Sequence, residues 1–360
     1  MNKEVSVENK PHLNEKSYLK TSFIRQNILP ILAAFIWGTS FVAQSIASKT
    51  ILPFGFNAVR NWIASAFLFL MMLLFKLYQK KQGKAAYSAY LKASFKIPKG
   101  MDIESFKKKQ KKDLVIGGTL CGLALTVAMN LQQSGIGDSG AGKAGFITVM
   151  YVVLVPVFGF IMGKKTPAKI VVSVILAVIG LYLLCIKEDF TIERSDIYLL
   201  CCAVVLTIQI LVVDHYANYV NGISLSWFQF TVVAVLSTIL MLIFEKPPEI
   251  QLIKNAIGPI LYTGIMSNGI AYTLQTLSQR GSNPTVVSLL LCVEAVFAVI
   301  FGAIILKEEM LPREIVGCII MFIAVIISQI PIRENKNRNK SKNKSKNKSK
   351  NKSKNKNETR

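Results

Sequence analysis

Two charged residues, Glu294 and Arg60, lie well inside long apolar segments of the sequence. An ionised side chain costs several kcal/mol in hydrocarbon, so residues of this kind are rare in membrane spans and are by default candidates for function. If both segments are helices, the two side chains lie at similar depths, because each residue adds about 1.5 Å to a helix. Two interpretations stay open: one buried ion pair, or a site in which Glu294 binds a cationic group or a proton while Arg60 binds a carboxylate.

A stripe of polar residues precedes Glu294. Four of them recur at i, i+4, i+7 and i+11, which share one face of a helix: Asn268, Tyr272, Gln275 and Gln279. A shorter stripe at i, i+3 and i+7 occurs in the first apolar segment: Trp37, Ser40 and Gln44. Such faces avoid lipid, so they either form hydrogen bonds between helices or line a hydrophilic path. We favour the path, because four long polar side chains exceed what packing requires.

Long helices must position these side chains, and the sequence contains ten apolar segments that suit this role. The chain has 360 residues, of which 52% are hydrophobic, and its mean hydropathy of +0.42 is too high for a soluble protein. Each segment is close to the roughly 20 residues that span about 30 Å of hydrocarbon. We therefore predict an all-α integral membrane protein with ten transmembrane helices, at residues 28–47, 54–77, 114–134, 144–163, 170–186, 196–213, 224–244, 256–278, 284–306 and 312–330.

The net charge of +23 is concentrated in a lysine-rich loop at residues 78–113 and a tail at residues 331–360. The tail has no aromatic residues between its charges, so we expect no nucleic acid partner. Both regions are instead expected to attract the anionic lipids of the inner leaflet. The Lys/Asn/Ser-rich tail has no apolar side chains to form a core and is predicted to be disordered. The positive-inside rule puts both termini in the cytoplasm of a multi-pass plasma membrane protein.

The ten spans are expected to form two five-helix repeats. A weak internal repeat, at an offset of 144 residues, aligns Val149 with Val293 and Lys169 with Arg313. Because five is an odd number of crossings, the second repeat enters the membrane inverted relative to the first. The predicted organisation is a cytoplasmic N-terminal tail, a first repeat that carries the basic loop, a second repeat and a cytoplasmic C-terminal tail, at residues 1–27, 28–186, 196–330 and 331–360.

We expect no cofactor, no metal site and no enzymatic activity. The six cysteines lie in apolar segments without a C-x-x-C pair, and neither histidine has a ligand-spaced partner. A G-x-G-x-x-G match at residues 135–140 follows a predicted membrane helix, whereas a dinucleotide site requires a strand. A G-x-x-x-x-G-K match at residues 137–143 lacks the hydroxyl residue that would bind Mg²⁺. The spans contain no pairing of a nucleophile with a base.

Both halves of the chain contain residues that match a known family. The matching features are a Trp-Gly-Thr-Ser-Phe element at residues 37–41, Arg60, Tyr272, Glu294, a Leu-Lys-Glu turn at residues 306–308, and Gly317. Together they resemble the drug/metabolite transporters of the EamA type, and the resemblance covers about residues 28–330. Ala295 stands where that family usually places a proline after the glutamate.

The resemblance implies a secondary transporter, often an exporter, that moves small polar or amphipathic metabolites by alternating access without nucleotide hydrolysis. The substrate would bind near the membrane midplane, at residues among which we include Glu294, Arg60, Trp37, Tyr272, Gln275, Asn268 and Gln44. Coupling to protons is a hypothesis that rests on Glu294 alone. The alternative is a non-transporting membrane sensor or scaffold that recruits a partner through the basic loop and tail.

Overall fold

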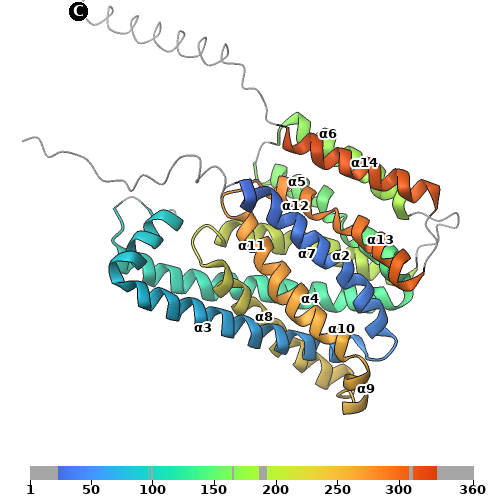
Figure 1. The fold of residues 1–360 in the computed structure, drawn as a ribbon, viewed down its shortest axis with the longest axis horizontal. Coiled ribbons are helices and arrows are strands. Elements are labelled where there is room, and N and C mark those ends of the chain that lie inside the picture. The colour runs from blue at the N-terminus through green and yellow to red at the C-terminus, as the bar shows by residue number, and fades with distance from the viewer. Residues whose placement is uncertain are drawn as a thin grey trace, which may run out of the picture. The chain divides into compact units, whose positions relative to one another are not determined.

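The computed structural model describes residues 23–95, 97–98, 100–163, 166–185, 193–307 and 311–330. All regular secondary structure in these ranges is helical, which confirms the all-α prediction for the described residues (Figure 1). Helical structure begins at Ile24, so the first span starts slightly before residue 28. Residues 1–22 of the predicted N-terminal tail (residues 1–27), the predicted C-terminal tail at residues 331–360, and Glu308 of the Leu-Lys-Glu turn lie outside the described residues.

The first three helical elements are η1 (Ile24–Ile28), α2 (Leu29–Ser48) and α3 (Pro53–Ser94). Proline stands in the first turn of both α2 and α3, where its missing N–H removes no helical hydrogen bond. The Glu245 carboxylate accepts hydrogen bonds from the backbone N–H groups of Phe54 (3.0 Å) and Gly55 (2.8 Å), which caps α3. Helical structure continues well past residue 77 to Ser94, so much of the predicted basic loop is helical.

The next elements are α4 (Ile103–Thr148), α5 (Tyr151–Ile161) and α6 (Ala168–Cys185). The third and fourth spans were predicted to be separated between residues 134 and 144, and α4 does change direction in this interval, at Gly140, where φ is 75°. The helical structure on the two sides of this kink is otherwise continuous. The glycines of this region allow close helix packing. A Cβ atom on Gly135 would lie 2.7 Å from Leu199 Cγ.

The remaining elements belong to the second half of the chain: α7 (Arg194–Tyr216), α8 (Gly222–Phe244), α9 (Ile250–Asn255), α10 (Ile257–Leu261), η2 (Tyr262–Ala271), α11 (Tyr272–Gln279), α12 (Pro284–Leu291), α13 (Glu294–Leu306) and α14 (Pro312–Gln329). The predicted eighth span is therefore divided into α10, the π-helix η2 and α11. A π-helix is wider than an α-helix and often occurs at functional sites. No pattern in the sequence predicted this π-helix.

Seven helical segments of the described residues are long and apolar enough to cross a membrane. Six of them coincide with single predicted spans, and the seventh, Ile103–Ile161, contains both the third and the fourth. The fifth predicted span corresponds to a shorter apolar helix at Ala168–Leu183. The remaining predicted span, the eighth, corresponds to the consecutive elements α10, η2 and α11. The chain is thus an all-helical, multi-pass membrane protein.

Two helix breaks lie at related positions of the two halves. The first separates α4 from α5 at Val149 and Met150, and the second separates α12 from α13 at Cys292 and Val293. The residue pair that the sequence repeat aligned, Val149 and Val293, falls in these two breaks. The second break forms although Ala295 replaces the expected proline, so proline is not what interrupts this helix.

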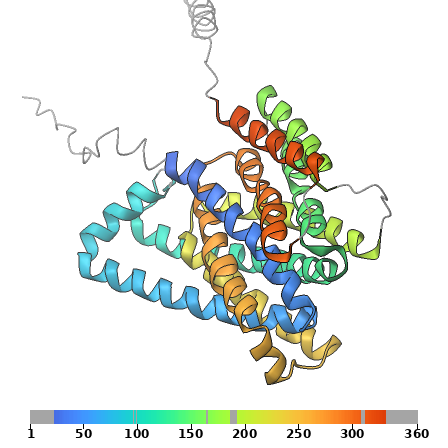
Figure 2. The same ribbon diagram turned by 45° about the vertical axis from the view of Figure 1, so that its right-hand side comes forward.

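Helices from distant parts of the sequence pack side by side. The helix α4 runs along α7 and α8, α3 runs along α8, and α2 runs along α13 (Figures 1 and 2). Gly38 sets the distance between α2 and α13, since its Cα faces Phe297 and the backbone oxygen of Glu294. This contact brings Glu294 against the first predicted span.

Replacing Gly38 with alanine should destabilise the protein by about 1–3 kcal/mol, as overpacking of a filled core does. The added Cβ would lie 2.3 Å from Phe297 Cβ and 2.8 Å from Glu294 O, which forces α2 away from α13. Gly159→Ala in α5 is the matched control, since nothing lies within 4 Å of its added Cβ. Thermal unfolding of the purified protein in detergent compares the two variants. Equal unfolding temperatures would contradict the packing described.

Candidate functional site

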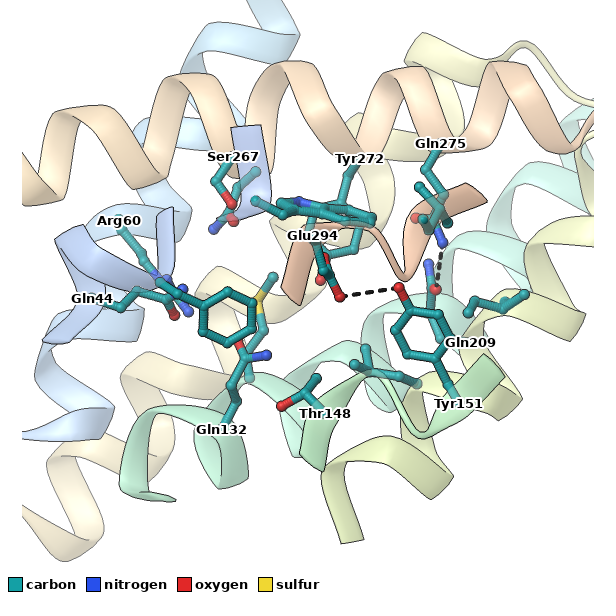
Figure 3. Close-up of a pocket in the computed structure, with 17 residues that line it drawn as sticks. Gln44, Arg60, Gln132, Thr148, Tyr151, Gln209, Ser267, Tyr272, Gln275 and Glu294 are labelled. Atoms are coloured by element: carbon teal, nitrogen blue, oxygen red, sulfur yellow. Dashed lines mark hydrogen bonds between the residues drawn. The ribbon is translucent and has the colours of Figure 1, made fainter. Parts of the chain in front are cut away.

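A cavity opens among the helices of both halves (Figure 3). Its lining comes from α2, α3, α4, α5, α7, η2, α11, α12 and α13. The structure brings together all seven of the residues predicted from the sequence as site residues, since each of them lines this cavity: Trp37, Gln44, Arg60, Asn268, Tyr272, Gln275 and Glu294.

Arg60 is held at one end of the cavity by neutral amide groups. Its side chain is 1% exposed, and it donates hydrogen bonds from Nε to Asn57 Oδ1 and from Nη1 to Gln44 Oε1, both at 2.8 Å. Asn57 is fixed in turn, because its Nδ2 donates to Asn130 Oδ1 at 2.8 Å. The Arg60 Nη2 atom is enclosed and has no hydrogen-bond partner. The guanidinium therefore keeps one donor free for a ligand.

Glu294 lies between Arg60 and the opposite end of the cavity (Figure 3). The side chain is 3% exposed, and its Oε1 accepts a hydrogen bond of 3.0 Å from the Tyr151 hydroxyl. Three ion pairs occur among the described residues, and none of them contains Glu294 or Arg60. The ion pair considered from the sequence is therefore not formed, and both side chains remain available to a third group.

The helix breaks explain how Glu294 and Tyr151 reach each other. Glu294 is the first residue of α13 and Tyr151 is the first residue of α5, so each side chain leaves its helix at a break that faces the cavity. A helix N-terminus carries a partial positive charge, which favours an anion on the first turn. This hydrogen bond joins the first half of the chain to the second at the edge of the cavity.

Aromatic rings cover the polar centre of the cavity. Trp37 and Tyr272 lie edge to face with ring centroids 4.7 Å apart, and Phe230 packs against the other side of Tyr272 at 5.1 Å. The Trp37 Nε1 atom is enclosed without a hydrogen-bond partner. These rings give the cavity an apolar surface next to Glu294, and the Trp37 N–H adds a free hydrogen-bond donor to that of Arg60.

The polar stripe of the eighth span both lines the cavity and bonds to other helices. Asn268 Nδ2 donates to Asn61 Oδ1 at 2.8 Å, and Gln275 Nε2 donates to Gln209 Oε1 at 3.3 Å. Gln279 lies outside the cavity lining and donates to the backbone oxygen of Ile210 at 3.3 Å. Asn268 and Gln275 therefore fit both explanations of this stripe, whereas Gln279 fits only hydrogen bonding between helices.

The sequence reasoning missed several polar lining residues: Gln132, Thr148, Tyr151, Gln209 and Ser267. Gln209 was the most visible of these, because a long amide inside the predicted span at residues 196–213 needs a partner. Tyr151 gave a weaker signal, since an aromatic residue in an apolar segment is usually part of the core. Its importance comes from the break at Val149 and Met150, which the sequence did not indicate.

The cavity offers more free donors than a closed core would. Arg60 Nη2, Trp37 Nε1 and Thr148 Oγ1 are enclosed without partners, and so are the acceptors Asn268 Oδ1 and Gln275 Oε1. Buried polar groups are normally hydrogen-bonded, because an unmade bond costs about 1–3 kcal/mol. Groups of this number around one space are best explained by a polar ligand or water that occupies it.

Comparison with known proteins agrees with this arrangement. The sequence profile described as the EamA-like transporter family matches residues 25–186 and 194–329. An "Uncharacterized transporter" of Archaeoglobus fulgidus is 29% identical over 322 residues, which cover 86% of this chain and 91% of that protein. The "Uncharacterized transporter YoaV" of Bacillus subtilis is 20% identical over 303 residues, which cover 83% of this chain and 94% of that protein.

A solved crystal structure of another protein has the same fold. It superimposes with a TM-score of 0.62 and covers 85% of this chain and 96% of its own, at 14% sequence identity. An identity this low supports a common fold and carries no information on ligands.

We expect the cavity to contain water. In a cysteine-free variant, single Asn268→Cys and Gln275→Cys substitutions should react with a hydrophilic maleimide several times faster than Val235→Cys, because a thiol needs water to ionise. Val235 lies on α8 and is 41% exposed on the outer surface of the helices, where lipid is expected. Labelling rates in membranes measure the difference. Rates as slow at residues 268 and 275 as at residue 235 would contradict a hydrated cavity.

Proposed function

The chain belongs to the EamA-like transporter family and is a multi-pass membrane transporter; from this premise we propose that it is a secondary transporter that exports small polar or amphipathic metabolites. The proposal includes alternating access of the cavity to the two sides of the membrane without nucleotide hydrolysis. It places the protein in the plasma membrane with both termini in the cytoplasm, since the positive charge is concentrated on that side of the predicted spans.

One observation carries this proposal: Arg60 and Glu294 line the same buried cavity and are not paired with each other. A buried charge without a partner is unfavourable, and a charged partner with good hydrogen-bonding geometry removes most of that penalty. A metabolite that carries an anionic group would satisfy Arg60 Nη2. A cationic group of the metabolite, or a proton, would satisfy Glu294. The Trp37 and Tyr272 rings would hold an apolar part of the same molecule.

In the proposed movement, two inverted five-helix repeats, at residues 28–186 and 196–330, tilt against each other. Discontinuous helices whose ends meet near the midplane are typical of transporters built in this way. The breaks at Val149 and Val293, and the Tyr151–Glu294 hydrogen bond that joins them, support this arrangement. Access would alternate as one repeat tilts against the other around the cavity.

Proton coupling is the finer part of the proposal. Glu294 is the one carboxylate that lines the cavity in the described residues. A proton on this group would leave it neutral while no substrate is bound, and the binding of a cationic group would release the proton. Exchange of substrate for protons then follows from competition for one side chain, so no second ion site is needed.

The alternative function, a non-transporting sensor or scaffold, rests on the basic loop and tail. A scaffold does not require a cavity lined by unpaired donors and acceptors, and this cavity is the feature that favours transport. We propose that the loop at residues 78–113 and the tail bind anionic lipids of the inner leaflet. Their role would be to attach the cytoplasmic face to the membrane.

Glu294→Gln should lower transport by at least about tenfold, the loss expected when a charge-assisted contact is removed. The amide keeps the size of the side chain and still accepts a hydrogen bond from Tyr151, so the unfolding temperature should not fall. Glu249→Gln, an exposed position before α9, is the matched control. Flux of a metabolite panel in proteoliposomes, with and without a pH gradient, measures the effect. Flux equal to that of the control would remove Glu294 from the mechanism.

Deletion of residues 333–360 tests whether the tail takes part in transport. If the tail only binds lipid, the truncated chain should transport at the rate of the full chain, because the residues that line the cavity in the described part of the chain all lie between Trp37 and Glu294. The same proteoliposome assay applies. Complete loss of flux in a truncated protein that still unfolds at the normal temperature would show that transport requires the tail, which contradicts a role limited to lipid binding.

A further inference from the structure

Two arginines meet at the end of the helices that carries the basic loop. Arg25 belongs to η1, and Arg280 follows α11 in the turn that leads to α12. Arg25 reaches this turn, since its Nη2 atom lies 3.8 Å from where a Cβ atom on Gly281 would be. The guanidinium of Arg280 stacks on the Phe95 ring at 4.1 Å from the centroid. Both charges are therefore held close to one turn.

This arginine pair has no counter-charge within the described ranges of the chain. The three ion pairs found there involve other residues. Arg25 Nε and Arg280 Nη2 are each enclosed and make no hydrogen bond. Burial lowers the pKa of Arg280, Tyr90 opposes this effect, and the charge of Arg25 lowers the pKa further. Two like charges with free donors in one place are unfavourable unless an anion binds between them.

The surroundings hold Arg280 in place. Phe95 belongs to a small buried cluster with Leu91 and Phe106, which joins the end of α3 to the start of α4. Tyr90, on the same helical segment, contacts the turn before α8, because Asn221 Nδ2 donates to its hydroxyl at 3.3 Å. The aromatic surface under Arg280 is thus anchored to two other elements. A preorganised guanidinium loses less entropy when it binds a ligand.

The position of Arg25 relates this pair to the membrane. The neighbouring side chains of Phe23 and Ile28 are 61% and 47% exposed, which is expected of residues that contact acyl chains. Arg25 would then lie at the depth of the lipid headgroups. Arginine is well suited to this position, since its planar guanidinium donates two parallel hydrogen bonds to a phosphate.

We propose that Arg25 and Arg280 form a binding site for a phosphate group, with Phe95 as the platform beneath it, and that the phosphate belongs to an anionic lipid of the adjacent leaflet. The site is separate from the transport cavity, because neither arginine lines that cavity. It also differs from general attraction by the lysines of the loop and tail, because it requires two specific guanidinium groups. A free phosphate or a soluble phosphoester has the same binding chemistry.

The test uses the full chain, purified in a non-ionic detergent. The unfolding temperature is recorded while phosphatidylglycerol, phosphatidylcholine or inorganic phosphate is added. Wild-type protein should show a saturable rise with phosphatidylglycerol and none with phosphatidylcholine. Arg25→Gln and Arg280→Gln should each weaken the apparent affinity by about tenfold, which corresponds to the loss of a charge-assisted contact.

Arg194→Gln provides the matched control. Arg194 is exposed and also packs on an aromatic ring, that of Tyr198 at 5.5 Å, but it is remote in sequence from the proposed site. The control should keep the wild-type affinity, since the lysines of the loop and tail affect all variants equally. Equal affinity for phosphatidylglycerol in all three variants, or no saturable rise in the wild type, would overturn the proposal.

Competition by inorganic phosphate and native mass spectrometry provide two further tests. A saturable rise with inorganic phosphate that competes with phosphatidylglycerol would support the phosphate site but would assign it to a soluble ligand. If either glutamine variant does not fold, native mass spectrometry of the wild type and of Arg25→Lys and Arg280→Lys replaces it. Retention of one phosphatidylglycerol by the wild type, reduced in the lysine variants, supports the site. Retention that is unchanged in the lysine variants contradicts it.

Discussion

The burial of a carboxylate and a guanidinium in one apolar interior, without an ion pair between them, is the constraint on which the rest of the structure depends. Each group must be solvated by the protein itself. For Arg60 this is done by amide oxygens from Asn57 and Gln44, which balance its donors without neutralising its charge. For Glu294 it is done by one tyrosine hydroxyl and the start of a helix. Both groups thus keep part of their binding capacity, which a mutual ion pair would consume.

Close packing of helices keeps these groups in place. Gly38 allows α2 to approach α13 until backbone and side chain touch, and Gly264 in η2 does the same beside the backbone oxygen of Arg60. A Cβ atom at either position would lie 2.8 Å from a backbone oxygen, so the two helices would have to move apart. These glycines therefore set the spacing of the helices that carry Glu294 and Arg60. The break before Glu294 needs no proline for the same reason, since its backbone is fixed from outside by α2.

The candidate site could be predicted because its residues are polar or charged and lie within otherwise apolar segments of the sequence. Glu294, Arg60, Asn268 and Gln275 are long polar side chains at positions where lipid would exclude them, and the helical spacing placed several of them on one face. Tyr151 could not be found in this way, because its role depends on a helix break and on a partner 143 residues away. The division of the eighth span into α10, η2 and α11 was also not predicted, since an α-helical period was assumed over the whole span and no sequence pattern marked the π-helix. The glycines between residues 134 and 144 separate the third and fourth predicted spans, and the structure has a kink there, at Gly140.

The Tyr151–Glu294 hydrogen bond has a further consequence under the proposed mechanism. Its two residues begin helices in different halves of the chain, so the proposed tilt of one half against the other would change the distance between them. The Tyr151 hydroxyl is the one hydrogen-bond partner of the Glu294 side chain in the described residues while the cavity holds no ligand. A cationic group that draws the carboxylate toward the substrate would also pull it away from Tyr151. Occupancy of the cavity and contact between the repeats would then be linked through a single carboxylate, which explains why one charged side chain at the break can serve both binding and movement.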